Sequence, residues 1–100
     1  MINRIVIMTF QSDKVDEFLS VFDVSKIAIR NFPGCQGLKL LQTAGKPNQL
    51  STYSLWNDED CLNNYRHSAL FEETWAKTKV LFSEKPVAFS TEVIRDLNTL

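Results

Sequence analysis

Residues 55–75 read LWNDEDCLNNYRHSALFEETW and contain both tryptophans and the only histidine of the 100-residue sequence. A predicted strand ends at Trp56, and the side chain of Asn57 or Asp58 can then accept hydrogen bonds from the free N–H groups of a short helix. Ser68 is a second capping residue, so we expect it to end this helix and begin another. Polar groups lie beside aromatic ones throughout the stretch. We therefore expect these residues to line any pocket that the protein has.

Hydrophobic periodicity predicts the elements before this stretch. Residues 2–10 carry apolar side chains on both faces, which is typical of a strand that is covered on both sides. Val15, Phe18 and Phe22 recur at steps of three and four residues. This spacing predicts an amphipathic helix over residues 14–30.

The complete set of elements predicts an α+β fold. Strands are predicted at 2–10, 37–43, 50–56 and 87–94. The helix after Ser68 is expected to carry Phe71, Trp75, Thr78 and Phe82 on one face. The order β-α-β-β-α-β is the ferredoxin-like pattern, in which one four-stranded antiparallel sheet has its helices on one face.

The length of the chain and the pattern of its strands predict one domain that forms a dimer. Residues 1–100 fit a single domain, with a core at about 2–94 and a tail at 95–100. Helices on one face would leave the other face of the sheet bare, although the strands carry apolar residues on both sides. A second sheet from another copy of the chain would cover that face. We therefore predict a homodimer, paired through the sheet face.

The charge balance and the N-terminal segment argue against several classes of partner. Eleven basic and twelve acidic residues give a net charge of -1. We see no basic stripe that would grip phosphates, so no nucleic acid partner is expected. The apolar segment 1–10 is too short to span a bilayer, so no membrane partner is expected. It also lacks a small-residue cleavage site, which favours a cytoplasmic location.

The histidine and the cysteines do not form a metal-binding pattern. Cys35 and Cys61 are far apart in the sequence and have no CxxC or histidine spacing, so no metal is expected. Free thiols in a reducing cytoplasm are the favoured interpretation, with a disulfide as the alternative.

Four segments of the sequence together carry a family resemblance. They are FPGCQG at 32–37, the Pro-Asn pair at 47–48, YSLWNDE at 53–59 and YRHSALF at 65–71. In combination they resemble the antibiotic biosynthesis monooxygenase (ABM) family, over about residues 2–94. The resemblance implies a small dimeric α/β barrel, which agrees with the fold predicted from periodicity. It also implies oxygen insertion into an electron-rich aromatic, such as a quinol or an anthrone, without a metal or flavin cofactor.

The sequence departs from the family pattern at several positions. Family members often have histidine at the position of Tyr65, and a second histidine at the position of Leu70, directly before Phe71. The heme-degrading branch has an iron-ligating histidine at the position of Trp75, and tryptophan cannot ligate iron. That branch also needs an asparagine within the first strand, where this chain has only Asn3 at the edge. Heme degradation is therefore disfavoured.

The predicted polar members of the site are Tyr65, Arg66 and His67. His67 is the only histidine and therefore a candidate base near neutral pH, with an exposed histidine at a helix end as the alternative. Tyr65 can donate a hydrogen bond to a bound carbonyl or oxyanion, and Arg66 can steady an anionic intermediate. The alternatives are a tyrosine that packs its ring on the core and a solvated arginine.

Aromatic side chains and one methionine are the predicted walls of an apolar cleft between sheet and helices, with plain core as the alternative. These predicted substrate-binding residues are Met8, Trp56, Phe71, Trp75 and Phe82. We therefore expect a cofactor-independent monooxygenase that acts on a small quinol, an anthrone-like compound or another electron-rich aromatic. The alternative is a non-catalytic binding or sensing module for an apolar small molecule, which the missing family histidines favour.

Overall fold

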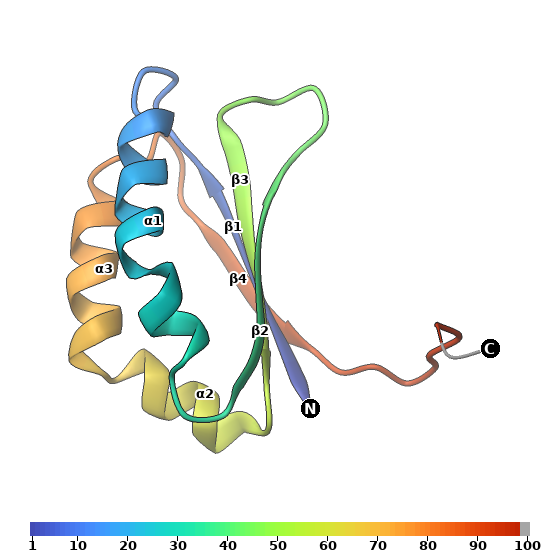
Figure 1. Cartoon of the computed structure of the whole chain (residues 1–100). Coiled ribbons are helices and arrows are strands. Elements are labelled where there is room, and N and C mark those ends of the chain that lie inside the picture. The colour runs from blue at the N-terminus through green and yellow to red at the C-terminus, as the bar shows by residue number, and fades with distance from the viewer. Residues whose placement is uncertain (99–100) are drawn as a thin grey trace.

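The computed structural model describes residues 1–98, so the last two residues of the predicted tail lie outside the described part. In chain order the elements are β1 (Ile2–Thr9), α1 (Val15–Arg30), β2 (Cys35–Gln42), β3 (Gln49–Trp56), α2 (Glu59–Arg66), α3 (Ala69–Lys79) and β4 (Val87–Thr91). The sheet has the order β2-β3-β1-β4, and every neighbouring pair is antiparallel. The helices lie on one side of the sheet (Figure 1). This arrangement confirms the predicted α+β, ferredoxin-like fold.

The register of the strands decides which side chains face the helices. Arg4, Val6 and Met8 alternate along β1 with Ile5 and Ile7, so the two sets lie on opposite faces of the sheet. The first set faces the helices, where Met8 belongs to the buried core. The two strands that flank β1 follow the same alternation. The sheet is therefore apolar on both faces, as the sequence predicts.

Two buried clusters hold the helices on the sheet. The larger cluster contains Met8, Phe10, Phe18, Leu50 and Leu81, and the smaller contains Cys35, Trp56 and Leu62. Phe10 is fully buried and stacks on Phe18 of α1, with ring centroids 4.4 Å apart. Burying one such ring contributes roughly 1.5–3 kcal/mol. Trp56 is also fully buried, and its Nε1–H donates to Ser54 Oγ at 2.9 Å, so its one polar atom is satisfied.

Two side-chain caps set the directions of α2 and α3. The Asp58 carboxylate accepts a hydrogen bond from the backbone N–H of Cys61 at 2.8 Å, and this bond lowers the pKa of Asp58. Ser68 Oγ accepts from the backbone N–H of Phe71 at 3.1 Å and donates to the carbonyl oxygen of Tyr65 at 2.6 Å. Both predicted caps are confirmed. Ser68 therefore joins the end of one helix to the start of the next.

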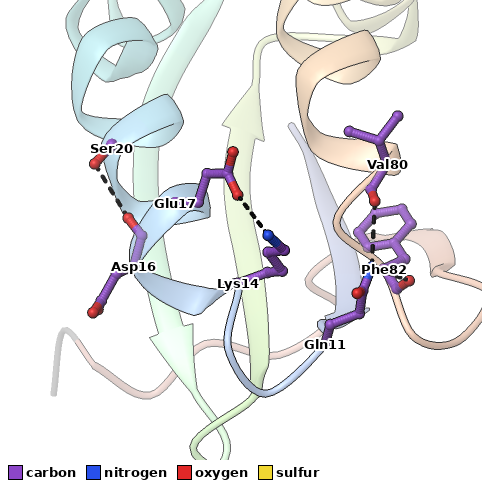
Figure 2. A network of polar contacts seen from close by, with 7 residues as sticks. All are labelled: Gln11, Lys14, Asp16, Glu17, Ser20, Val80 and Phe82. Atoms are coloured by element: carbon purple, nitrogen blue, oxygen red, sulfur yellow. Dashed lines mark hydrogen bonds and ion pairs between the residues drawn. The ribbon is translucent and has the colours of Figure 1, made fainter.

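The end of α3 differs from the prediction. The helix ends at Lys79, so the prediction that Phe82 continues its apolar face is wrong. Phe82 instead forms an antiparallel bridge with Phe10. The side chain of Gln11 donates to the carbonyl oxygens of Val80 and Phe82, at 3.4 and 3.5 Å (Figure 2). These contacts hold the segment after α3 against the segment that follows β1.

Two strands also differ from their predicted bounds by more than one residue. β4 ends at Thr91 rather than Ile94. Thr91 pairs with Asn3, and β1 begins only one residue before Asn3, so little of β1 is left for a longer β4 to pair with. β2 begins at Cys35 rather than Gly37, because a bulge between these residues extends its pairing with β3.

The outer face of the sheet, opposite the helices, is apolar and carries no helix among residues 1–98. Its apolar side chains are Ile5, Ile7, Leu41, Tyr53, Leu55, Val87 and Phe89. Leu41 and Phe89 are 48% and 41% exposed. The chain after β4 extends away from the sheet on this side (Figure 1). The homodimer stays a prediction, since a single chain does not show what covers this face.

Candidate functional site

A cavity of about 310 Å³ lies between the sheet and the three helices. Its volume is near the lower end of the range for ligand pockets, roughly 300–1,000 Å³. Most of its wall is apolar. The polar and charged lining residues are Arg4, Thr52, Ser54, Tyr65, Arg66, Thr74 and Thr78. Such a space suits a small, mostly apolar ligand that carries a few polar groups.

Most of the predicted site residues line this cavity. Those that do are Met8, Tyr65, Arg66, Phe71 and Trp75. Trp56 and Phe82 lie outside the lining and support it from behind. The ring of Trp56 stacks on Tyr65 with centroids 5.0 Å apart, and Phe82 meets Trp75 edge-on at 5.5 Å. The aromatic residues thus form one continuous wall, of which only the middle part reaches the cavity.

His67 lies outside the cavity. It is the exposed C-cap residue of α2, and its Nδ1 lies 2.8 Å from the carbonyl oxygen of Asn63. This contact ties the imidazole ring to its own helix. Among the lining residues of the described chain there is no histidine, aspartate or glutamate. The cavity wall itself therefore offers no imidazole or carboxylate base.

Tyr65 contacts three other aromatic residues. Its ring stacks on Trp56 and meets Phe32 and Phe71 edge-on, at 5.4 and 5.3 Å. Burial, and to a lesser extent the nearby Cys35, raises the pKa of Tyr65 to about 12. The hydroxyl is therefore protonated at neutral pH. It can donate a hydrogen bond to a ligand but is not available as a base.

Arg4 and Arg66 bring two positive charges to the same cavity. Arg4 comes from β1, and its Nη1–H donates to Ser90 Oγ of β4 at 3.3 Å. Burial, and second the positive charge of Arg66, lower the pKa of Arg4, although the guanidinium group stays protonated. Neither arginine forms a salt bridge with an acidic side chain within residues 1–98. Sequence reasoning missed Arg4 as a site residue, although it stands among apolar residues on one face of a strand.

Two features of other protein classes are absent from the described residues. No group of three or more His, Cys, Asp or Glu side chains could hold a metal ion there. No helix in that part is both long and apolar enough to cross a membrane.

Both cysteines are free, with Cys35 buried and Cys61 half-buried. The expected absence of a cofactor and the cytoplasmic location stay predictions.

Comparison with known proteins identifies the family. The sequence profile of the antibiotic biosynthesis monooxygenase family matches residues 1–77. Because this match covers most of the chain, the protein belongs to that family. No curated protein matches the sequence.

Solved structures share the fold over nearly their whole length. An antibiotic biosynthesis monooxygenase has a TM-score of 0.88 at 14% identity, with 95% of this chain and 100% of that chain covered. Rv0793 from Mycobacterium tuberculosis has a TM-score of 0.87 at 14% identity, with 97% and 98% covered. A mutant of SnoaB, a cofactor-independent oxygenase from Streptomyces nogalater, has a TM-score of 0.86 at 18% identity, with 97% and 96% covered. At these identities the likeness establishes the fold alone.

The raised pKa of Tyr65 predicts a loss of stability at alkaline pH. The unfolded chain releases the phenol proton around pH 10, whereas the folded chain holds it until about pH 12. The contribution of Tyr65 is therefore complete below pH 10 and is lost as the pH rises through this interval. Between about pH 9 and pH 11, the free energy of unfolding of the wild type should fall by roughly 1 kcal/mol more than that of Tyr65→Phe. Urea unfolding at several pH values measures this, and equal losses in the two proteins would contradict it.

Proposed function

We propose that this protein is a monooxygenase that inserts one oxygen atom of O2 into a small electron-rich aromatic, such as a quinol or an anthrone-like compound. The cavity is the observation that carries this proposal. Its lining is mostly apolar and aromatic, and it includes Tyr65, whose hydroxyl is neutral, and the arginines Arg4 and Arg66. Membership of the monooxygenase family supports it, and so does SnoaB, a cofactor-independent oxygenase with the same fold.

The substrate itself supplies the electrons that reduce O2. A quinol that has lost a proton is electron-rich enough to pass electrons to O2 directly. One oxygen atom bonds to a ring carbon in place of hydrogen, the quinol becomes a quinone, and the other oxygen atom leaves as water. One quinol and one O2 thus give one hydroxyquinone and one water, so no other oxidant or reductant is required.

The polar lining residues have roles that suit these anionic steps. The positive charges of Arg4 and Arg66 favour the deprotonated form of a bound phenol and so lower its pKa. The Tyr65 hydroxyl donates a hydrogen bond to the oxyanion, as a pre-positioned donor. Because the lining contains no histidine or acid in the described part of the chain, the phenol proton passes to water. His67, the base predicted from the sequence, has no role in this proposal.

The apolar wall positions the aromatic ring. Phe71 and Trp75 both line the cavity, and their rings are stacked with an interplanar angle of 10° and centroids 5.8 Å apart. Met8 lies on the sheet side, where its flexible thioether side chain can adapt to the shape of a ligand. A flat ligand would lie between these two sides.

A non-catalytic binding or sensing module is the second candidate function. The absence of a histidine or acidic base from the described cavity lining favours it. Such a module would bind an apolar small molecule in the same cavity and would consume no O2. Oxygen uptake therefore separates the two functions.

Oxygen uptake by the purified protein with a panel of quinols and anthrones should exceed the rate of autoxidation. Tyr65→Phe removes only the hydroxyl donor and should lower kcat roughly a hundredfold. His67→Ala should keep the wild-type rate, because His67 lies outside the cavity. An unchanged rate in Tyr65→Phe would mean that the hydroxyl does not serve the reaction. No uptake by the wild type across the panel would favour the binding module.

We also propose that two copies pair through the outer face of the sheet. Apolar side chains of that face would otherwise stay in water, including Phe89 of β4, which pairs with Ile5 of β1. A contiguous exposed apolar patch commonly marks a protein interface. Burial of the patch by a second sheet would stabilise both chains, because a 100-residue chain buries only a modest core.

Phe89→Asp should convert the dimer to a monomer, because a carboxylate within the proposed interface would lose its water without a partner charge. Val24→Asp is the matched control, since Val24 lies on α1 and is 85% exposed. Size-exclusion chromatography with light scattering measures the mass of each variant. The pairing would be refuted by a monomeric wild type, or by a Phe89→Asp variant that keeps the dimer mass.

A further inference from the structure

We infer that Arg4 and Arg66 form a subsite for a carboxylate group, and that the natural ligand of the cavity is an aromatic acid. These arginines are the only charged side chains in the cavity lining, as far as the structure describes the chain. Arg4 extends from β1, and Arg66 is the last residue of α2. Two separate elements therefore direct cations to one space.

The two cations have different surroundings, because Arg66 is exposed to solvent whereas Arg4 is partly covered. Arg4 is half-buried, and burial and the charge of Arg66 both lower its pKa. No acidic side chain in the described residues forms a salt bridge with either arginine. Ser90 accepts one hydrogen bond from Arg4 but brings no charge. A bound anion would relieve the repulsion and would use the remaining guanidinium donors.

The side chains that β1 contributes to the cavity lining change from charged to apolar along the strand. Arg4, Val6 and Met8 lie on the same face of this strand, and the four steps from Arg4 to Met8 span about 13 Å. Met8 is buried and packs in the core cluster that contains Phe18. A ligand that fills the cavity would place its charge near Arg4 and its rings toward Met8. This shape and polarity fit a carboxylate attached to a small fused-ring system.

The oxyanion of the proposed reaction does not by itself account for both arginines. A single phenolate oxygen accepts few hydrogen bonds, and the neutral hydroxyl of Tyr65 already offers one. A guanidinium group presents a planar fork that matches the two oxygens of a carboxylate. That the ring of this acid is oxidised rests on the proposed function, whereas the carboxylate subsite does not.

Naphthoate and its neutral amide, naphthamide, test the subsite without any reaction with O2. Isothermal titration calorimetry on the 100-residue chain should show that naphthoate binds at least about tenfold more tightly than naphthamide, because its carboxylate makes charge-assisted hydrogen bonds. Arg4→Gln and Arg66→Gln should each remove most of this preference. Arg66→Lys should keep part of the preference for naphthoate that Arg66→Gln loses, since lysine keeps the charge but not the planar guanidinium group. Arg95→Gln is the control, because Arg95 donates to its neighbour Ile94 outside the cavity.

Several results would overturn the carboxylate subsite. They are equal affinity for the acid and the amide, no binding of either probe, and a preference that survives in both glutamine variants while thermal unfolding shows that they are folded. Inorganic phosphate should displace naphthoate only weakly, because it leaves the apolar end of the cavity empty. Phosphate that competes as well as naphthoate would assign the arginines to an inorganic anion and would also overturn the inference.

Oxygen uptake separates the failure of this inference from the failure of the proposed function. A preference for naphthoate, without oxygen uptake by a carboxylated naphthoquinol, would retain the subsite and reject the monooxygenase. Oxygen uptake with a neutral quinol, without any preference for naphthoate, would retain the monooxygenase and reject the subsite.

Discussion

The hydrogen bonds of Ser68 are the constraint on which the geometry of the cavity depends. Its Oγ joins the carbonyl of Tyr65 at the end of α2 to the N–H of Phe71 at the start of α3, so one side chain fixes the bend between the helices. In one continuous helix, Arg66 and Trp75 would be about two and a half turns apart and would point in opposite directions. Because the helix is broken, both side chains line the same cavity.

That bend brings together groups that would not otherwise share a space. The aromatic wall of α3 provides burial, and Arg66 adds a charge to a space that already holds Arg4. Arg4 is half-buried and has no acidic partner among the described residues. Local rules of protein stability are broken most often at functional sites. The same cavity therefore combines the features that oxygenation of an aromatic anion requires: an apolar wall, a neutral donor and positive charge.

The sequence predicts local structure well where the determinants are local. The caps at Asp58 and Ser68 depend on side-chain oxygens next to their own helices, and alternation along β1 predicts a sheet with two apolar faces. The end of α3 depends instead on the bridge between Phe82 and Phe10, far away in the sequence.

The site is predicted less completely for the same reason. Tyr65 and Trp75 were accessible to sequence reasoning because they lie in the stretch that breaks the helix. The proposed role of Arg4 depends on the nearby charge of Arg66, which belongs to a different element. Whether His67 lines the cavity depends on the residue at which α2 ends. Oxygenation in this cavity is tested most directly by mass spectrometry of the product that the wild-type protein forms from a quinol under isotopically labelled O2. The account predicts one labelled oxygen atom in the product and the other in water, at a rate far above that of Tyr65→Phe. A product without label, or equal rates in the two proteins, would contradict it.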